Sequence, residues 1–276
     1  MIFSCEFLIR KHGRSSKIPE IIGALMIRYS SPHNTRIFGI VLLLLIVILF
    51  AGKVYFVRSA ADTQPIETTS GVVRYLPIGD SYTIGETTFE QSSFPSQLAK
   101  KLTADGIRTE VIANPARTGF TTRQVIDIEL PVLERSRPDM STLLIGVNDW
   151  VQGISEDEFR SNLSAILDRM KADIPSGNIV VITIPDFSIT PTGKLYAVNR
   201  DAKAGISRFN QIVSEEALKR RIPVVDIYPL SQTLGVTGGY VALDGLHPTG
   251  KAYARWIELI YPVVRTQLLK NSSPSK

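Results

Sequence analysis

From Val72 onward, the sequence alternates short apolar, β-branched runs with longer segments of helical period. Most of these runs are continuous and not alternating, as expected of strands that are buried on both faces of a sheet. Such an alternation favours right-handed crossovers and a parallel sheet with helices on both faces. We therefore expect a single α/β domain over residues 72–270, without an internal repeat. The expected strands are 72–78, 109–114, 141–146, 179–185 and 223–229, and the expected helices lie near 94–104, 121–136, 155–174, 201–221 and 248–269.

The segment 155–174 illustrates the helical pattern. Acidic residues occupy its first turn, which suits the positive end of a helix dipole. Its apolar residues recur at the spacing of one helical face, and we expect this face to be buried. The residues of this face are Phe159, Leu163, Ile166, Leu167 and Met170.

Residues 37–57 form an apolar run that is interrupted by a single charge, Lys53. A helix that spans a bilayer needs about 20 apolar residues, whereas the core of a secretory signal has about 7 to 15. We expect an uncleaved membrane anchor here, with a cleaved signal as the alternative. Arg28 and Arg36 precede the run, and this favours a cytoplasmic N-terminus and a domain on the periplasmic or extracellular side.

The other boundaries follow from composition. Residues 1–36 are expected to be a basic cytoplasmic segment. A chain that began at Met26 would place basic residues directly before the apolar run, as in an export signal, so residues 1–25 are either a cytoplasmic extension or a misassigned start. Small and polar residues make 58–71 a tether, and 271–276 form a short tail.

The formal net charge of +5 does not indicate a nucleic-acid-binding domain. Residues 1–58 contain eight Lys or Arg and two acidic residues, whereas the rest of the chain contains 23 basic and 24 acidic residues. The only cysteine is Cys5, which excludes a disulfide or a thiolate metal site in the domain. His247 is the only histidine after residue 58, so a histidine-rich metal site is excluded and any histidine base must be His247.

Four loop segments carry polar residues at the places where a parallel sheet holds its functional groups, beyond the carboxyl ends of strands or before a helix. Each segment alone has an ordinary explanation as a turn or a helix cap. Together they supply every group that one reaction needs. The segments are GDSYTIG (79–85), NPARTGFTT (114–122), GVNDWVQG (146–153) and DGLHPTG (244–250).

That reaction is acyl transfer through a serine, which requires a nucleophile, a base, a group that holds the base, and donors to the developing oxyanion. Ser81 is the candidate nucleophile and His247 the candidate base. Asp244, three residues earlier, can accept from the imidazole and fix its tautomer. The backbone N–H groups of Ser81 and Gly119, with the side-chain amide of Asn148, are candidate oxyanion donors.

With these residues in this order, the chain resembles the SGNH subgroup of the GDSL hydrolases, a family of esterases, lipases and lysophospholipase-like enzymes. The resemblance covers about residues 72–268, and the four blocks are specific only together. It matches the family nucleophile, the second-block glycine, the Gly-x-Asn-Asp asparagine and the closing Asp-x-x-His. The matching residues are Ser81, Gly119, Asn148, Asp244 and His247.

The resemblance implies a flavodoxin-like three-layer sandwich with a central parallel five-stranded sheet, here preceded by one N-terminal apolar helix. It also implies no cofactor, no metal, and hydrolysis of carboxylic esters or thioesters through an acyl-enzyme on Ser81. Tyr82 replaces the leucine of the nominal Gly-Asp-Ser-Leu, a departure that concerns the shape of the pocket. Tyr82, Phe120 and Trp150 flank the candidate site residues and are candidates for the pocket lining, with core packing as the alternative.

Other functions remain open at this point. An envelope glycan O-acyltransferase or deacetylase would use the same first half-reaction, and a catalytically inactive, membrane-tethered binding module would use none of it. For a hydrolase, the expected substrate is a small-molecule, lipid or glycan ester. Tyr82 stands where a haloacid dehalogenase phosphatase needs its second carboxylate, and GDSYTIG lacks the spacing and lysine of a P-loop. The loop 185–201 is long enough to form part of a substrate rim.

Overall fold

A computed structural model describes residues 71–174 and 177–272, and the fold is described for these residues. The helix expected at 37–57, the segment 1–36 and almost all of the tether lie outside the described residues. Among the residues described, no helix combines the length and apolar character needed to cross a bilayer.

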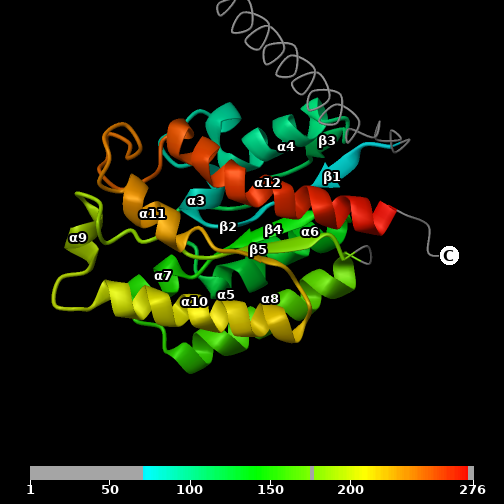
Figure 1. Ribbon diagram of the computed structural model, residues 1–276. Helices are drawn as coiled ribbons and strands as arrows, with labels where there is room; N and C mark the ends of the chain where they lie inside the picture. Colours follow the sequence, from blue (N-terminus) through cyan, green and yellow to red (C-terminus); the bar gives the residue numbers. More distant parts are fainter. Residues whose placement is uncertain (1–70, 175–176, 273–276) are drawn as a thin grey trace, which may run out of the picture. The chain divides into compact units, whose positions relative to one another are not determined.

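Two parallel sheets form the centre of the domain (Figure 1). One has four strands in the order β2, β4, β5 and β6, and its register aligns Ile78, Leu143, Val181 and Val224 across the sheet. The other pairs β1 with β3. Each expected strand is found, in a shorter form. The strands are β1 (Val73–Tyr75), β2 (Ile78–Gly79), β3 (Thr109–Val111), β4 (Ser141–Leu144), β5 (Ile179–Ile182) and β6 (Val224–Val225).

The expectation of one continuous five-stranded sheet is wrong in this respect, because the first strand is divided into β1 and β2. The break falls at Leu76 and Pro77, and proline has no N–H to donate to a strand ladder. The two sheets still meet at this point. Tyr75 forms an isolated parallel bridge with Met140, and the Leu76 N–H donates to the Met140 carbonyl at 3.1 Å.

Helices cover both sides of the strands, as expected of a three-layer arrangement (Figure 1). Helices α4 (Phe94–Ala104) and α12 (Gly250–Ser272) pack together on one side, and α8 (Glu156–Asp173) and α10 (Ala202–Lys219) pack together on the other. The five apolar residues that the sequence placed on one face of α8 are all buried. Shorter helices are α3 (Ser81–Ile84), η1 (Glu90–Ser92), α7 (Val147–Gln152), α9 (Gly193–Tyr196) and α11 (Tyr228–Leu234).

The helix expected at 121–136 is divided into three parts. A short α5 (Thr122–Gln124) leads into a π-helical turn, η2 (Val125–Glu129), and then into α6 (Leu130–Ser136). Pro131 stands near the start of α6, where it cannot donate a helical hydrogen bond and its ring crowds the preceding turn. The wider turn accommodates this crowding, and it carries a buried carboxyl, Glu129, towards the sheet.

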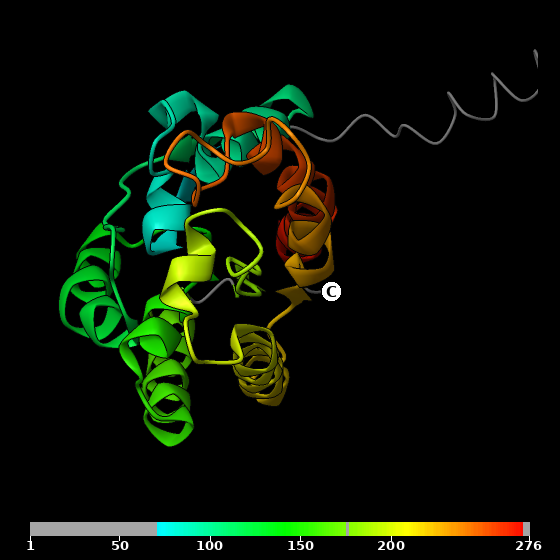
Figure 2. The same ribbon diagram turned by 90° about the vertical axis from the view of Figure 1, so that its left-hand side faces the viewer.

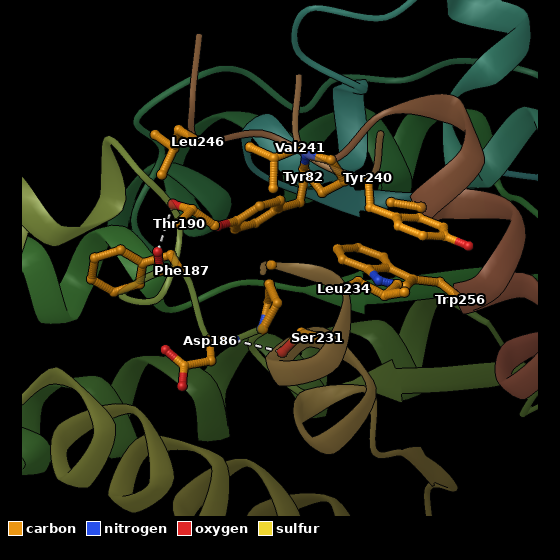
Figure 3. Close-up of a pocket in the computed structure, with 14 residues that line it drawn as sticks. Tyr82, Asp186, Phe187, Thr190, Ser231, Leu234, Tyr240, Val241, Leu246 and Trp256 are labelled. Atoms are coloured by element: carbon orange, nitrogen blue, oxygen red, sulfur yellow. Dashed lines mark hydrogen bonds between the residues drawn. The ribbon is translucent and has the colours of Figure 1, made fainter. Parts of the chain in front are cut away.

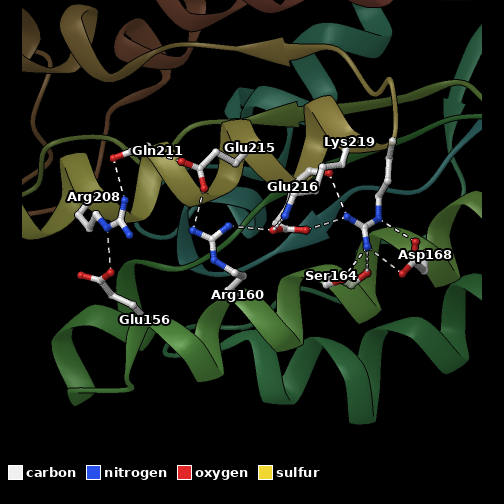
Figure 4. Close-up of polar contacts among 10 residues, drawn as sticks. Glu156, Arg160, Ser164, Asp168, Arg208, Gln211, Glu215, Glu216 and Lys219 are labelled. Carbon is white, nitrogen blue, oxygen red and sulfur yellow. Dashed lines mark hydrogen bonds and ion pairs between the residues drawn. The ribbon is translucent and has the colours of Figure 1, made fainter.

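An ionic network joins α8 to α10 (Figure 4). Its centre is Glu216, which is 3% exposed and accepts from Arg160 at 2.9 Å, Lys219 at 2.7 Å and Arg220 at 2.9 Å. Burial alone would raise the pKa of Glu216, but the three cationic donors outweigh it and lower this pKa to about 2. The carboxylate therefore stays ionised in the folded protein at neutral pH.

Candidate active site

The candidate nucleophile is the first residue of α3, directly after the tight turn that follows β2. The Asp80 side chain caps α3, because its Oδ1 accepts from the Tyr82 N–H at 3.0 Å. Gly79 leaves no room for a side chain, because a Cβ there would lie 2.2 Å from Thr83 Oγ1 and 2.3 Å from the Leu144 carbonyl oxygen. Ser81 is itself buried, yet its hydroxyl and its N–H have no hydrogen-bond partner among the described residues. Both groups are thus available to a ligand.

The candidate base and acid form a close pair on the loop before α12. His247 Nδ1 lies 2.5 Å from Asp244 Oδ2, and Asp244 Oδ1 accepts from the N–H groups of Leu246 and His247 at 3.0 and 3.1 Å. Partial burial opposes ionisation of Asp244, but these hydrogen bonds outweigh it and lower the pKa of the carboxyl. The carboxylate therefore orients the imidazole and leaves Nε2 as the ring atom for a substrate or nucleophile.

The structure brings this pair to the nucleophile turn. The ring of Tyr82, the residue after Ser81, meets the His247 ring edge-on with 5.9 Å between centroids. Ser81 and His247, 166 positions apart in the chain, therefore lie at the same edge of the sheet. No hydrogen bond joins the serine hydroxyl to the imidazole in the described part of the chain. Figure 2 views the end of the domain where α3, α9 and the loop before α12 lie.

The candidate oxyanion donors come from two neighbouring loops that are tied together. Asn148 Nδ2 donates to the Phe120 carbonyl at 2.9 Å, which places the asparagine next to Gly119 and leaves its second amide hydrogen unused. Gly119 has a φ of +82°, a backbone conformation that favours glycine, and its N–H has no acceptor among the described residues. A Cβ at Gly119 would have no atom within 4 Å, so the space above this backbone is open.

A buried aspartate that the sequence interpretation did not assign holds these loops in place. Asp149 is fully buried and accepts from the Thr122 N–H at 3.0 Å and from the Thr122 hydroxyl at 2.5 Å. Burial raises the pKa of Asp149, and the hydrogen bonds from Thr122 oppose the shift. The two neighbouring residues thus have different roles. Asn148 contacts the loop of Gly119, and Asp149 anchors the start of α5. The sequence signal was the aspartate that ends the Gly-x-Asn-Asp block.

The three candidate pocket residues separate in the structure. Tyr82 lines a narrow, mainly apolar pocket together with Leu246 and Trp256 (Figure 3). The loop 185–201 contributes Phe187 to the lining of this pocket. Phe120 and Trp150 are not part of this lining.

Trp150 is instead packed as core. Its ring lies 5.8 Å from the Phe187 ring, between centroids, and the Arg200 guanidinium stacks on it at 3.8 Å. This matches the core-packing alternative for that residue. Across the described residues, no group of three or more His, Cys, Asp or Glu side chains could hold a metal ion.

Comparison with known proteins identifies the family of the chain. Residues 78–255 match the model of the GDSL-like Lipase/Acylhydrolase family. The chain is 21% identical over 193 residues to the esterase TesA of Pseudomonas aeruginosa, an alignment that covers 70% of this chain and 88% of that protein.

Solved structures share the fold. The crystal structure of TesA superposes with a TM-score of 0.57 at 20% identity, covering 71% of this chain and 99% of TesA. An acetyl xylan esterase from Geobacillus stearothermophilus gives a TM-score of 0.56 at 18% identity, covering 70% and 94% of the two chains. A family 3 carbohydrate esterase from Clostridium thermocellum gives 0.56 at 19% identity, covering 71% and 98%. With a family match over most of its length, this chain belongs to the GDSL-like lipase and acylhydrolase family.

Proposed function

We propose that the chain is a serine esterase that cleaves carboxylic esters or thioesters through an acyl-enzyme on Ser81. The observation that carries the proposal is the meeting of two distant segments at one edge of the sheet. The Asp244–His247 pair, with 2.5 Å between carboxylate and imidazole, contacts the turn that presents an unpartnered serine hydroxyl. Nucleophile, base and orienting acid are the minimum set for this chemistry.

The proposed cycle has two halves. The Ser81 Oγ attacks the carbonyl carbon while its proton passes to His247 Nε2, and the ester C–O bond then breaks as the imidazolium gives this proton to the leaving alkoxide. Water then attacks the acyl-enzyme and gives a proton to His247. The carboxylic acid leaves, and the proton returns to the Ser81 oxygen. Asp244 stabilises the imidazolium in both halves through its contact with Nδ1.

The negative oxygen of each tetrahedral intermediate would bind to the N–H groups of Ser81 and Gly119 and to the free amide hydrogen of Asn148. Both backbone donors lack acceptors within the part of the chain described. Donors that are already fixed before the reaction stabilise the transition state without reorganisation, and removal of one typically costs about 10²–10³ in turnover.

For the substrate we propose a small-molecule or glycan ester. Two fold relatives carry names that associate them with carbohydrate esters, an acetyl xylan esterase and a family 3 carbohydrate esterase. We further propose that the domain works outside the cytoplasm, tethered by the apolar run at 37–57. An acyltransferase with the same first half-reaction would differ only in its acceptor.

The test is hydrolysis of a short-chain aryl ester by four proteins: wild type, Ser81→Ala, His247→Ala and the control Ser161→Ala. Ser161 is an exposed residue of α8 and belongs to none of the four site segments. We expect the first two variants to lose activity and the control to keep it. Wild-type turnover in Ser81→Ala would refute the nucleophile assignment. Adding a sugar acceptor separates the two classes, since an acyltransferase forms the sugar ester at the expense of hydrolysis.

A further inference from the structure

A buried carboxyl contacts the backbone of the nucleophile turn. Glu129, at the end of the π-helical turn η2, is 0% exposed, and its Oε2 accepts from the Gly79 N–H at 3.0 Å. Gly79 lies two residues before Ser81. The acyl-transfer steps above assign no role to this carboxyl, although a fully buried acid is costly for the fold.

The surroundings of Glu129 favour its protonated form. Glu129 Oε1 and Asp80 Oδ2 are both buried and have no partner among the described residues. Burial raises the pKa of Glu129 to about 8, with a further rise from Asp80, while the Gly79 hydrogen bond and Arg117 oppose the shift. Burial likewise raises the pKa of Asp80 to about 8, with a further rise from Asp149. Burial is thus the main cause that favours the uncharged form of Glu129, and the neighbouring acid is a lesser one.

The nucleophile turn is held at two points, and Glu129 is one of them. Asp80 holds the downstream side by capping α3 at the Tyr82 N–H, and Glu129 holds the upstream side at the Gly79 N–H. Without Glu129, the Gly79 N–H is buried without an acceptor, a state that folded proteins avoid. The turn would then rearrange to satisfy this donor, and Ser81 would move with it.

We propose that Glu129 is a positioning residue for the nucleophile, whose carboxyl oxygen fixes the Gly79 N–H and hence the position of Ser81 relative to His247. This inference rests on the proposed function, in which Ser81 is the nucleophile. Misplacement of a reacting group by about 1 Å can cost on the order of 10² in rate. A residue that does not touch the substrate can therefore have a large effect on turnover.

The experiment compares Glu129→Gln, Glu129→Leu and the control Asp127→Asn. Glutamine keeps an uncharged side chain with a carbonyl acceptor of the same length, leucine removes the acceptor, and Asp127 is an exposed acid on the same turn. The readouts are the rate at which a fluorophosphonate labels Ser81, located by peptide mass spectrometry, and kcat and KM for a short aryl ester. Circular dichroism and melting temperature report whether each variant is folded.

We expect Glu129→Leu to label about 100-fold more slowly than wild type, with a matching loss in kcat and an unchanged KM. We expect Glu129→Gln and Asp127→Asn to stay within about threefold of wild type, since both keep the acceptor at Gly79. If the leucine variant does not fold, Glu129→Asp takes its place, because the shorter side chain cannot reach the Gly79 N–H.

Two results would overturn the inference: a folded Glu129→Leu that labels at the wild-type rate, or a Glu129→Gln as slow as the variant without the acceptor. If Glu129→Asp replaces leucine, wild-type labelling by that variant also overturns it. Failure of the proposed function has a different signature, because wild-type protein would then not be labelled at Ser81 at all.

Discussion

Replacement of Asp244 by asparagine isolates the role of the carboxylate. Asp244 Oδ1 accepts two backbone N–H groups of its own loop, at 3.0 and 3.1 Å, and Oδ2 faces His247 Nδ1 at 2.5 Å. An asparagine can keep both loop hydrogen bonds with its single oxygen, so the loop should hold its shape. Its NH₂ then faces Nδ1 and donates to it. The imidazole proton must move to Nε2, and the ring can no longer accept the proton of Ser81.

The size of the effect follows from this tautomer change. The same exchange in a serine protease triad lowers kcat on the order of 10⁴-fold, and we expect a loss of this size here. At about 1.4 kcal/mol per tenfold, this corresponds to roughly 5.5 kcal/mol of transition-state stabilisation.

The assay is steady-state hydrolysis of a short aryl ester by Asp244→Asn and wild type, with the melting temperature as the check on folding. A loss of less than tenfold in a folded variant would refute the reasoning that Asp244 sets the tautomer of His247.

Three further predictions concern the oxyanion site, the nucleophile turn and the fold. Asn148→Ala should leave a folded enzyme whose kcat is about 10²–10³ lower, because one oxyanion donor is lost; an unchanged kcat would remove Asn148 from the site. Gly79→Ala should abolish ester hydrolysis, because its Cβ would lie 2.3 Å from the Leu144 carbonyl oxygen; normal turnover would contradict this. Glu216→Ala should lower the free energy of unfolding in urea by about 1.5–3 kcal/mol, since Arg160, Lys219 and Arg220 lose a buried acceptor. Glu258→Ala, which breaks an exposed ion pair, should cost less than about 1 kcal/mol, and equal losses would contradict the role of burial. The pKa of Glu216 is lowered to about 2, so its contribution to the free energy of unfolding is fully present above its unfolded pKa of about 4.3. This contribution is lost as the pH falls towards 2, and acid titration of the wild-type protein measures the loss.

The sequence predicted the elements whose apolar residues recur at a regular spacing. Helix α4 was expected at 94–104 and has those bounds, and the apolar face of α8 is buried as its spacing indicated. The edge that holds the loops follows from a general rule for parallel sheets, which is why Ser81 and His247 could be predicted to lie at one edge without coordinates.

The departures from prediction have local causes that the spacing of apolar residues does not reveal. The first strand breaks at Pro77, where the ladder loses a donor, and the expected helix at 121–136 widens into a π turn before Pro131. Glu129 lies in this π turn, and the sequence analysis did not assign it a role. Its position in the sequence nevertheless indicated one. It lies four residues after Val125, so a helix places both on one face, and an acid on an apolar face is a candidate for a functional role.

The central claim is that Ser81 attacks a carbonyl whose oxygen turns towards Gly119 and Asn148. The most direct test is a crystal structure of the protein after reaction with a fluorophosphonate. The account predicts electron density continuous from the Ser81 oxygen to phosphorus, with the phosphoryl oxygen about 2.7–3.1 Å from the N–H groups of Ser81 and Gly119 and from the Asn148 amide. An adduct on another side chain, or a phosphoryl oxygen directed away from these donors, would contradict it.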